Sequence, residues 1–95
     1  MKVYKYKLEA VEQQYLKLPQ GSRILKADAV EEELFIWALV DPEKTVEEHR
    51  IIHVYPTGVD VDYPDCLHHI DTVLMLNGAL VWHVFECMPN AVVRQ

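Results

Sequence analysis

Two cysteines and five histidines are the side chains of this sequence best suited to metal binding or nucleophilic catalysis. Cys66, His68 and His69 lie close together, and Cys87 follows at the far end of an apolar segment. A zinc site requires paired ligands at spacings such as Cys-x2-Cys, and a nucleophilic cysteine requires a histidine oriented by a third group. The sequence has neither pattern, so we expect no metal site, no cofactor and no catalytic residue, with Cys87 as a small buried hydrophobe.

An Asp-x-Asp pair, Asp60 and Asp62, is the other arrangement that could support acid–base chemistry. It lies in a glycine- and proline-containing segment, where carboxylates are usually solvated. The sequence contains no Gly-x-Ser-x-Gly motif and no phosphate-binding glycine loop. A small hydrolase that uses Asp60, Asp62, His68 or His69 is therefore the least favoured alternative, and we predict a protein that is not an enzyme.

Flat side chains and cations in strand-like segments are better suited to ligand binding. An aromatic ring can stack on a base or sugar, and an arginine or lysine can pair with a phosphate. The candidate ligand-binding residues are Arg50, Trp37, Tyr55, Trp82, His83, Arg23 and Lys26. A structural role competes with this one, because bulky aromatics dominate the cores of small β domains. We expect Trp37 and Trp82 in the core, and His83 as a core histidine bonded to Thr72.

The segments that must position these side chains have the patterns of strands. Val3–Leu8 alternates strictly, which places its tyrosines and Leu8 on one face and its lysines on the other. Other strands are expected at Tyr15–Leu18, Arg23–Val30, Leu34–Val40 and Arg50–Tyr55. A helical turn at Glu9–Gln14 and another after Asp41-Pro42 are alternatives. Pro56–Leu67 is expected to be a long surface loop.

The C-terminal third predicts a β-hairpin. Asn77-Gly78 lies between two apolar segments, and these residues tolerate the positive φ of a type I′ turn. A two-residue turn places Thr72 opposite His83 and Ile70 opposite Phe85, and the same register places His68 opposite Cys87.

About seven strands predict a single all-β domain over residues 1–95, either a small antiparallel β-sandwich or a partly open barrel. Leu34–Val40 and the hairpin are apolar on both faces. A strand of this kind is normally covered on both sides, by a second sheet or by another subunit. We therefore expect a homo-oligomer.

Charge and targeting signals limit the classes of partner. Fifteen acidic and nine basic side chains give a net charge of −6, which repels nucleic acid and anionic membranes. We see no signal peptide and no apolar run of transmembrane length, so a cytoplasmic protein with its cysteines as thiols is expected.

Several segments together resemble a family of short, functionally uncharacterised proteins of tailed phages and prophages. The matching segments are Tyr4-Lys5-Tyr6-Lys7-Leu8, Leu18-Pro19-Gln20-Gly21 with Ile24-Leu25, Trp37-Ala38-Leu39-Val40-Asp41-Pro42, Thr57-Gly58 and Gly78-Ala79-Leu80-Val81-Trp82-His83-Val84-Phe85-Glu86. The resemblance covers most of the chain but not Cys66–His69, and it implies no catalytic residues.

The resemblance implies a small accessory protein that acts by occupancy in the host cytoplasm. Some phage proteins of this kind are oligomeric sponges that sequester the nucleotide signals of bacterial defence. We expect such a homo-oligomer with a small nucleotide-like ligand. The alternative is a protein–protein interaction module that inhibits a host protein or serves virion assembly. Its acidic face would comprise Glu31, Glu32, Glu33, Glu43, Glu47 and Glu48.

Overall fold

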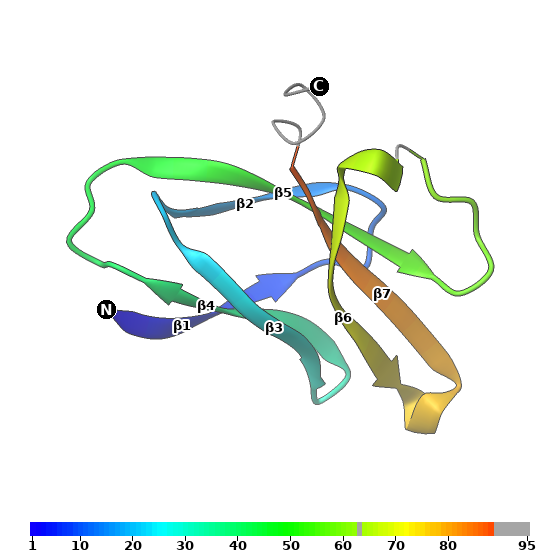
Figure 1. Ribbon diagram of the computed structural model, residues 1–95. Coiled ribbons are helices and arrows are strands. Elements are labelled where there is room, and N and C mark those ends of the chain that lie inside the picture. Colours follow the sequence, from blue (N-terminus) through cyan, green and yellow to red (C-terminus); the bar gives the residue numbers. More distant parts are fainter. Residues whose placement is uncertain (63, 89–95) are drawn as a thin grey trace.

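The computed structural model describes residues 1–62 and 64–88, which form seven strands in two antiparallel sheets (Figure 1). The three-stranded sheet has the order β1-β4-β3, formed by Lys2–Leu8, Glu33–Val40 and Arg23–Val30. The four-stranded sheet has the order β2-β5-β7-β6, formed by Gln14–Pro19, Glu47–Pro56, Leu80–Cys87 and Leu67–Met75. The predicted all-β fold with about seven strands is confirmed.

Helical structure in the described residues is limited to two short 3-10 turns, Pro64–Cys66 and Leu76–Gly78. The alternative helical turn at Glu9–Gln14 does not form, and the Gln14 side chain instead closes a bend by bonding to the backbone of Glu9. The segment after Val40 is a turn in which Asp41 Oδ1 accepts a hydrogen bond from the Glu43 N–H. No helix in the described part of the chain is long and apolar enough to cross a membrane.

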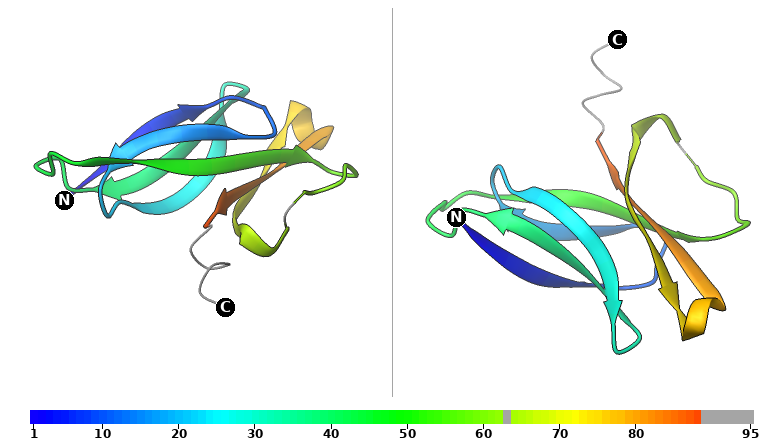
Figure 2. Two further views of the ribbon diagram at one scale, coloured as in Figure 1. Left: turned by 90° about the horizontal axis from the view of Figure 1, so that it is seen from above. Right: turned by 60° about the horizontal axis from the view of Figure 1, so that its bottom comes forward.

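The two sheets meet along one seam, between β3 and β6. These strands approach each other near the tips of their hairpins and diverge toward the other ends (Figures 1 and 2). The Ala27 N–H on β3 donates to Asp71 Oδ2 on β6, at 3.2 Å, and the Leu76 N–H donates to Glu32 Oε1 between the two tips, at 2.9 Å. Side-chain hydrogen bonds therefore join the sheets where the seam is closed.

The core lies between the sheets and follows strand alternation. Leu34, Ile36, Ala38 and Val40 project inward from β4, and each is at most 3% exposed. The facing sheet contributes Ile52, Val54, Val73 and Val84. On β1 the predicted alternation is confirmed at Leu8, which is buried, and at the lysines, which are exposed.

Trp37 is not in the core, contrary to the prediction. It lies half-buried on the outer face of β4, beside Phe35 and Leu39. Every residue from Leu34 to Val40 is apolar, so the sequence pattern of β4 alone does not say which face turns inward. Trp82, in contrast, packs against the core from β7, and its indole N–H lies 3.1 Å from Met75 Sδ.

The predicted hairpin register is confirmed near the turn and wrong beyond it. Thr72 pairs with His83, but an irregularity at Ile70 shifts the register by one residue. Phe85 therefore pairs with His69 instead of Ile70, and Cys87 pairs with Leu67 instead of His68. The extra residue also turns the Ile70 side chain onto the core rather than the outer face.

The turn at Asn77-Gly78 has the expected positive φ, at 55° and 88°. The Ala79 N–H donates to the Leu76 carbonyl across it, at 3.0 Å. Leu76 also has positive φ, 51°, although its side chain is large and exposed. The connection between β6 and β7 is thus wider than the predicted two residues.

Candidate functional site

The outer face of the three-stranded sheet carries the strongest concentration of groups suited to an anionic ligand. In the strand register, Trp37 lies between Lys5 on β1 and Lys26 on β3, and Phe35 lies next to Lys7. We call this surface the basic aromatic face, formed by Lys5, Lys7, Arg23, Lys26, Phe35 and Trp37. Three of the seven predicted site residues, Trp37, Arg23 and Lys26, therefore lie on one surface.

The two rings of this face have lysines as neighbours. The Lys5 Nζ atom lies 4.5 Å from the centroid of the Phe35 ring, and the Lys26 Nζ atom lies 5.6 Å from the centroid of the Trp37 ring. The ring centroids are 6.3 Å apart. Because both lysines are exposed, these cation–π contacts are weak and an incoming ligand can displace them.

The basic aromatic face is not neutralised by its own carboxylates. Lys26 pairs with Asp28 at 3.2 Å, and Lys7 lies near Glu9 and Glu33 at 3.3 and 3.6 Å. The hydrogen bond to Glu9 raises the pKa of Lys7. Lys5 and Arg23 form no ion pair within residues 1–62 and 64–88. Two exposed cations thus remain without an anionic partner on a protein of net charge −6.

Arg50 is not a free cation. It is half-buried on β5, and its guanidinium bonds to both carboxylate oxygens of Glu86 on β7. It also donates to the Ser22 carbonyl oxygen at 2.7 Å and to Glu48 Oε2 at 3.3 Å. The carboxylate of Glu86, followed by that of Glu48, raises the pKa of Arg50. Arg50 therefore links β5 to β7, and its charge is already paired with the carboxylates of Glu86 and Glu48.

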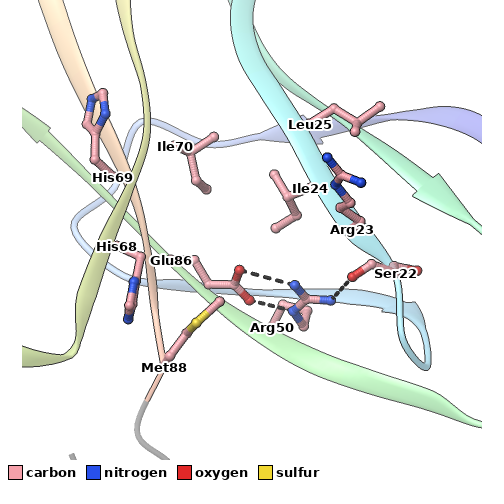
Figure 3. Close-up of a pocket in the computed structure, with 10 residues that line it drawn as sticks. All are labelled: Ser22, Arg23, Ile24, Leu25, Arg50, His68, His69, Ile70, Glu86 and Met88. Atoms are coloured by element: carbon pink, nitrogen blue, oxygen red, sulfur yellow. Dashed lines mark hydrogen bonds and ion pairs between the residues drawn. The ribbon is translucent and has the colours of Figure 1, made fainter. Parts of the chain in front are cut away.

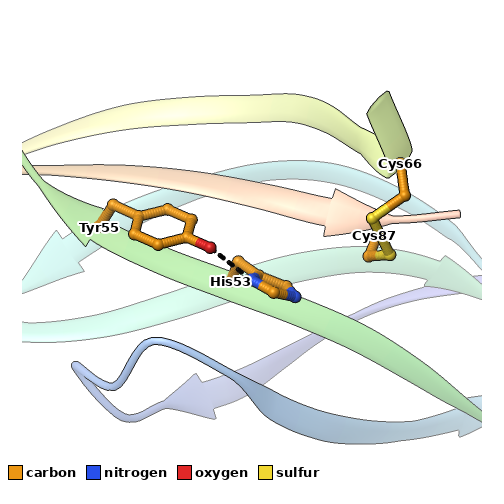
Figure 4. Close-up of a disulfide and its surroundings, with 4 residues drawn as sticks. All are labelled: His53, Tyr55, Cys66 and Cys87. Carbon is orange, nitrogen blue, oxygen red and sulfur yellow. Dashed lines mark hydrogen bonds between the residues drawn. A yellow bond between two sulfur atoms is a disulfide. The ribbon is translucent and has the colours of Figure 1, made fainter. Parts of the chain in front are cut away.

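Tyr55 and His83 lie apart from the basic aromatic face, on the outer side of the four-stranded sheet. Tyr55 is only 2% exposed, and its hydroxyl lies 2.9 Å from Nδ1 of His53 (Figure 4). Burial raises the pKa of Tyr55, with the negative charges of Glu12 and Asp62 adding to the effect. This ring is covered and is not available for stacking.

His83 is held between two threonines. Its Nδ1 atom lies 3.3 Å from Thr72 Oγ1, as predicted, and its Nε2 atom lies 2.7 Å from Thr57 Oγ1. His69 Nε2 lies 3.0 Å from the same Thr72 oxygen. His83 is half-buried on the outer face rather than in the core, so the predicted bond is confirmed and the predicted core position is wrong.

The cysteines form a disulfide, which corrects the expectation of two thiols. Cys66, at the end of the first 3-10 turn, is joined to Cys87, at the end of β7, with the Cα atoms 4.9 Å apart (Figure 4). The Met88 N–H also donates to the Cys66 carbonyl at 2.7 Å. The two cysteines are 21 residues apart in the sequence. Closing a loop of this length stabilises the fold by about 3 kcal/mol. Within the described ranges, no group of three or more His, Cys, Asp or Glu side chains comes together as a metal site would require.

Lys5 and Phe35 belong to this face but were not among the predicted site residues. The available signal was the strict alternation of β1, which turns Lys5 and Lys7 outward and therefore places them beside the outward residues of the neighbouring strand. That neighbour could not be identified from the sequence, because strand order is a long-range property.

Comparison with known families covers nearly the whole chain. Residues 1–94 match the model of a domain of unknown function, DUF7352. The chain belongs to this family. No curated protein and no solved structure matches it. Since the description of DUF7352 includes no ligand or reaction, the chemistry of the basic aromatic face is the available guide to function.

Proposed function

We propose that this chain is a non-enzymatic binding protein for a nucleotide-like anion, and that the basic aromatic face is its binding surface. The observation that carries the proposal is the position of Lys5, Lys7, Arg23 and Lys26 around Phe35 and Trp37. Four of the nine lysines and arginines thus surround two aromatic rings on one face of an acidic protein.

Each part of a nucleotide has a matching group on this surface. A base stacks on Trp37 or Phe35, a contact that contributes about 1–3 kcal/mol per base. A phosphate pairs with Lys5 or Arg23, which have no other ion pair in the described part of the chain. Lys26 exchanges its exposed partner Asp28 for the phosphate, at little cost because such surface pairs are weak.

The proposed biological role is sequestration. A small accessory protein of the phage type removes a nucleotide-like defence signal from the host cytoplasm simply by binding it. A flat sheet face covers only one side of a small ligand, so a second copy that closes over it would complete the site. The proposed active form is accordingly a homo-oligomer.

The alternative of an acidic protein-docking face has less support. Glu31, Glu32 and Glu33 lie at the β3–β4 turn, whereas Glu43 and Glu47 follow β4 at its other end. Glu48 is engaged by Arg50 and by the Gly21 N–H. These glutamates therefore form separate groups instead of one surface, which favours the anion-binding role.

The experiment uses Trp37 as the reporter. In a Trp82→Phe background, Trp37 is the sole tryptophan, and its fluorescence is followed against cyclic dinucleotides, cyclic oligonucleotides and ADP-ribose-derived nucleotides. We expect one ligand class to quench this fluorescence saturably and to raise the melting temperature. Lys5→Ala and Lys26→Ala should each weaken binding several-fold, because each removes a cation beside the stacked ring.

Lys17→Ala is the matched control, since Lys17 is an exposed lysine on β2 of the other sheet. It should leave the affinity unchanged. The proposal is contradicted if no nucleotide in the panel changes Trp37 fluorescence, or if Lys17→Ala weakens binding as much as Lys5→Ala does.

A further inference from the structure

A cleft of about 420 Å³ opens where β3 and β6 diverge (Figure 3). It shares Arg23 with the basic aromatic face, but the rest of its lining lies in the seam between the two sheets. The side chains of Ile24 and Ile70 point toward each other across it, and the Arg50–Glu86 pair lies at one end beside Met88 (Figure 3). The cleft thus combines apolar side chains with polar ones, which include His68, His69 and the Arg50–Glu86 ion pair.

The strands that border the cleft are both sheet edges. β3 pairs only with β4 and β6 only with β7, and no backbone hydrogen bond joins the two within the described residues. The Ala27–Asp71 contact, a backbone-to-side-chain bond, closes the seam beyond the cleft. The backbone of each edge is therefore free, beside the cleft, to pair with another strand.

An irregularity in strand pairing occurs on each side of this cleft. The β3–β4 register shifts at Leu25, and the β6–β7 register shifts at Ile70. Both residues line the cleft. Bulges bend a strand and redirect its edge, and they are frequent beside binding sites. Both irregularities therefore lie where the edges of the two sheets separate.

We propose that this seam binds an extended peptide of a partner protein by β-strand addition along the Arg23–Leu25 edge of β3. Main-chain hydrogen bonds to the edge supply affinity, and an apolar side chain inserted between Ile24 and Ile70 supplies selectivity. Arg23 is exposed at the rim and forms no ion pair with any described residue, so a carboxylate on the peptide complements it.

An extended peptide fits these features better than a compact ligand does. A small anion would use Arg23 but would leave the edge backbone and the isoleucine walls unused. A second copy of the chain has edge strands of its own, so self-association at this edge is an outcome that the test must distinguish. The proposed partner segment therefore alternates apolar and polar residues and carries an Asp or Glu beside an apolar residue.

The test is selection from a random heptapeptide display library on the full chain with its disulfide intact. We expect enriched sequences with alternating apolar residues and an acidic residue. Arg23→Glu should weaken the binding of an enriched synthetic peptide at least tenfold. Lys17→Glu, an equal charge reversal on exposed β2, should change it less than twofold.

Two further measurements separate strand addition from other modes of binding. N-methylation of alternate peptide amides should weaken binding at least tenfold, and hydrogen exchange at the Leu25 amide should slow when the peptide is bound. The proposal is overturned if no sequence is enriched, if the methylated peptide binds equally well, or if Leu25 is protected by self-association alone. Lys5→Ala should leave peptide binding intact, so a failure of the nucleotide proposal is distinguishable from a failure of this one.

Discussion

His53 shows how one buried side chain makes this fold sensitive to pH. It is 5% exposed on β5, and its ring centroid lies 5.7 Å from that of Tyr55. Burial lowers the pKa of His53, because the imidazolium loses more hydration than the neutral ring does, and the charge of Glu12 offsets part of this effect. The folded protein therefore favours the neutral imidazole.

We predict that the melting temperature falls as the pH decreases through about 6.5, the usual pKa of an unfolded histidine. Below this value the unfolded chain binds a proton that the folded chain resists, so unfolding becomes easier; above it the contribution to stability is complete. His53→Gln should reduce this slope between pH 7.5 and 5, as measured by thermal denaturation.

His49→Gln is the matched control, because His49 is an exposed histidine on the same strand. It should retain the slope of the unmodified chain. Equal slopes for His53→Gln and the unmodified chain would show that another group is responsible.

At the scale of the element, the β3–β4 turn is a two-residue turn whose positions are occupied by glutamates, although its backbone conformation favours other residue types. Val30 pairs with Glu33, so Glu31 and Glu32 alone form the turn, with φ of 52° and 64°. This left-handed conformation favours Asn or Gly. Glu32 has a role there, since its carboxylate accepts the Leu76 N–H of the neighbouring hairpin.

We predict that Glu31→Asn stabilises the protein by about 0.5–1 kcal/mol, because Asn tolerates positive φ better than Glu does. Urea denaturation measures the change. Glu33→Asn is the comparison: it alters a strand residue instead of the turn, and it removes a partner of Lys7. A gain at Glu33 equal to that at Glu31 would argue against the conformational explanation.

The elements were largely predictable from sequence, and their irregularities were not. Alternation in β1 and the Asn77-Gly78 pair act locally, so the strands and the positive φ values at that turn follow from neighbouring residues. The bulge at Ile70 depends on the partner strand and on the contact between Asp71 and β3. Because of this extra residue, Cys87 pairs with Leu67 and not with His68 as the regular register predicts. The disulfide that Cys87 forms was not predicted either.

At the scale of the whole molecule, the protein has principal extents of 40 × 36 × 16 Å. Few polar contacts join the two sheets within the described residues. Arg50 is central to them: it joins β5 to Glu86 on β7 and reaches across to the Ser22 carbonyl at the start of β3. The side chains of Arg50 and Glu86 are 15% and 7% exposed. A charge left alone there would be poorly hydrated.

We predict that Glu86→Leu or Arg50→Met alone lowers the free energy of unfolding by about 3 kcal/mol, because each leaves the other charge buried without its partner. The double variant should cost clearly less than the sum of the two. Chemical denaturation of all four proteins gives this coupling energy. Additive losses would show that the two side chains contribute independently.

The candidate site was predictable only in part, because it depends on contacts between strands that are distant in the sequence. Trp37, Arg23 and Lys26 were identified by residue type, and the β3–β4 register places them on one face. Arg50, Tyr55 and Trp82 were identified in the same way, but their neighbours engage or cover them. The packing of distant strands decides which aromatic and cationic groups remain available to a ligand, and the composition of the chain does not encode that packing.

The covalent link between Cys66 and Cys87 encloses all of β6, the exposed Asn77-Gly78 turn and β7. A protease that cuts once within that turn therefore leaves its two fragments tied together. The nicked chain would keep the mass of the intact one on a nonreducing gel, and it would separate into two bands only after treatment with a reductant.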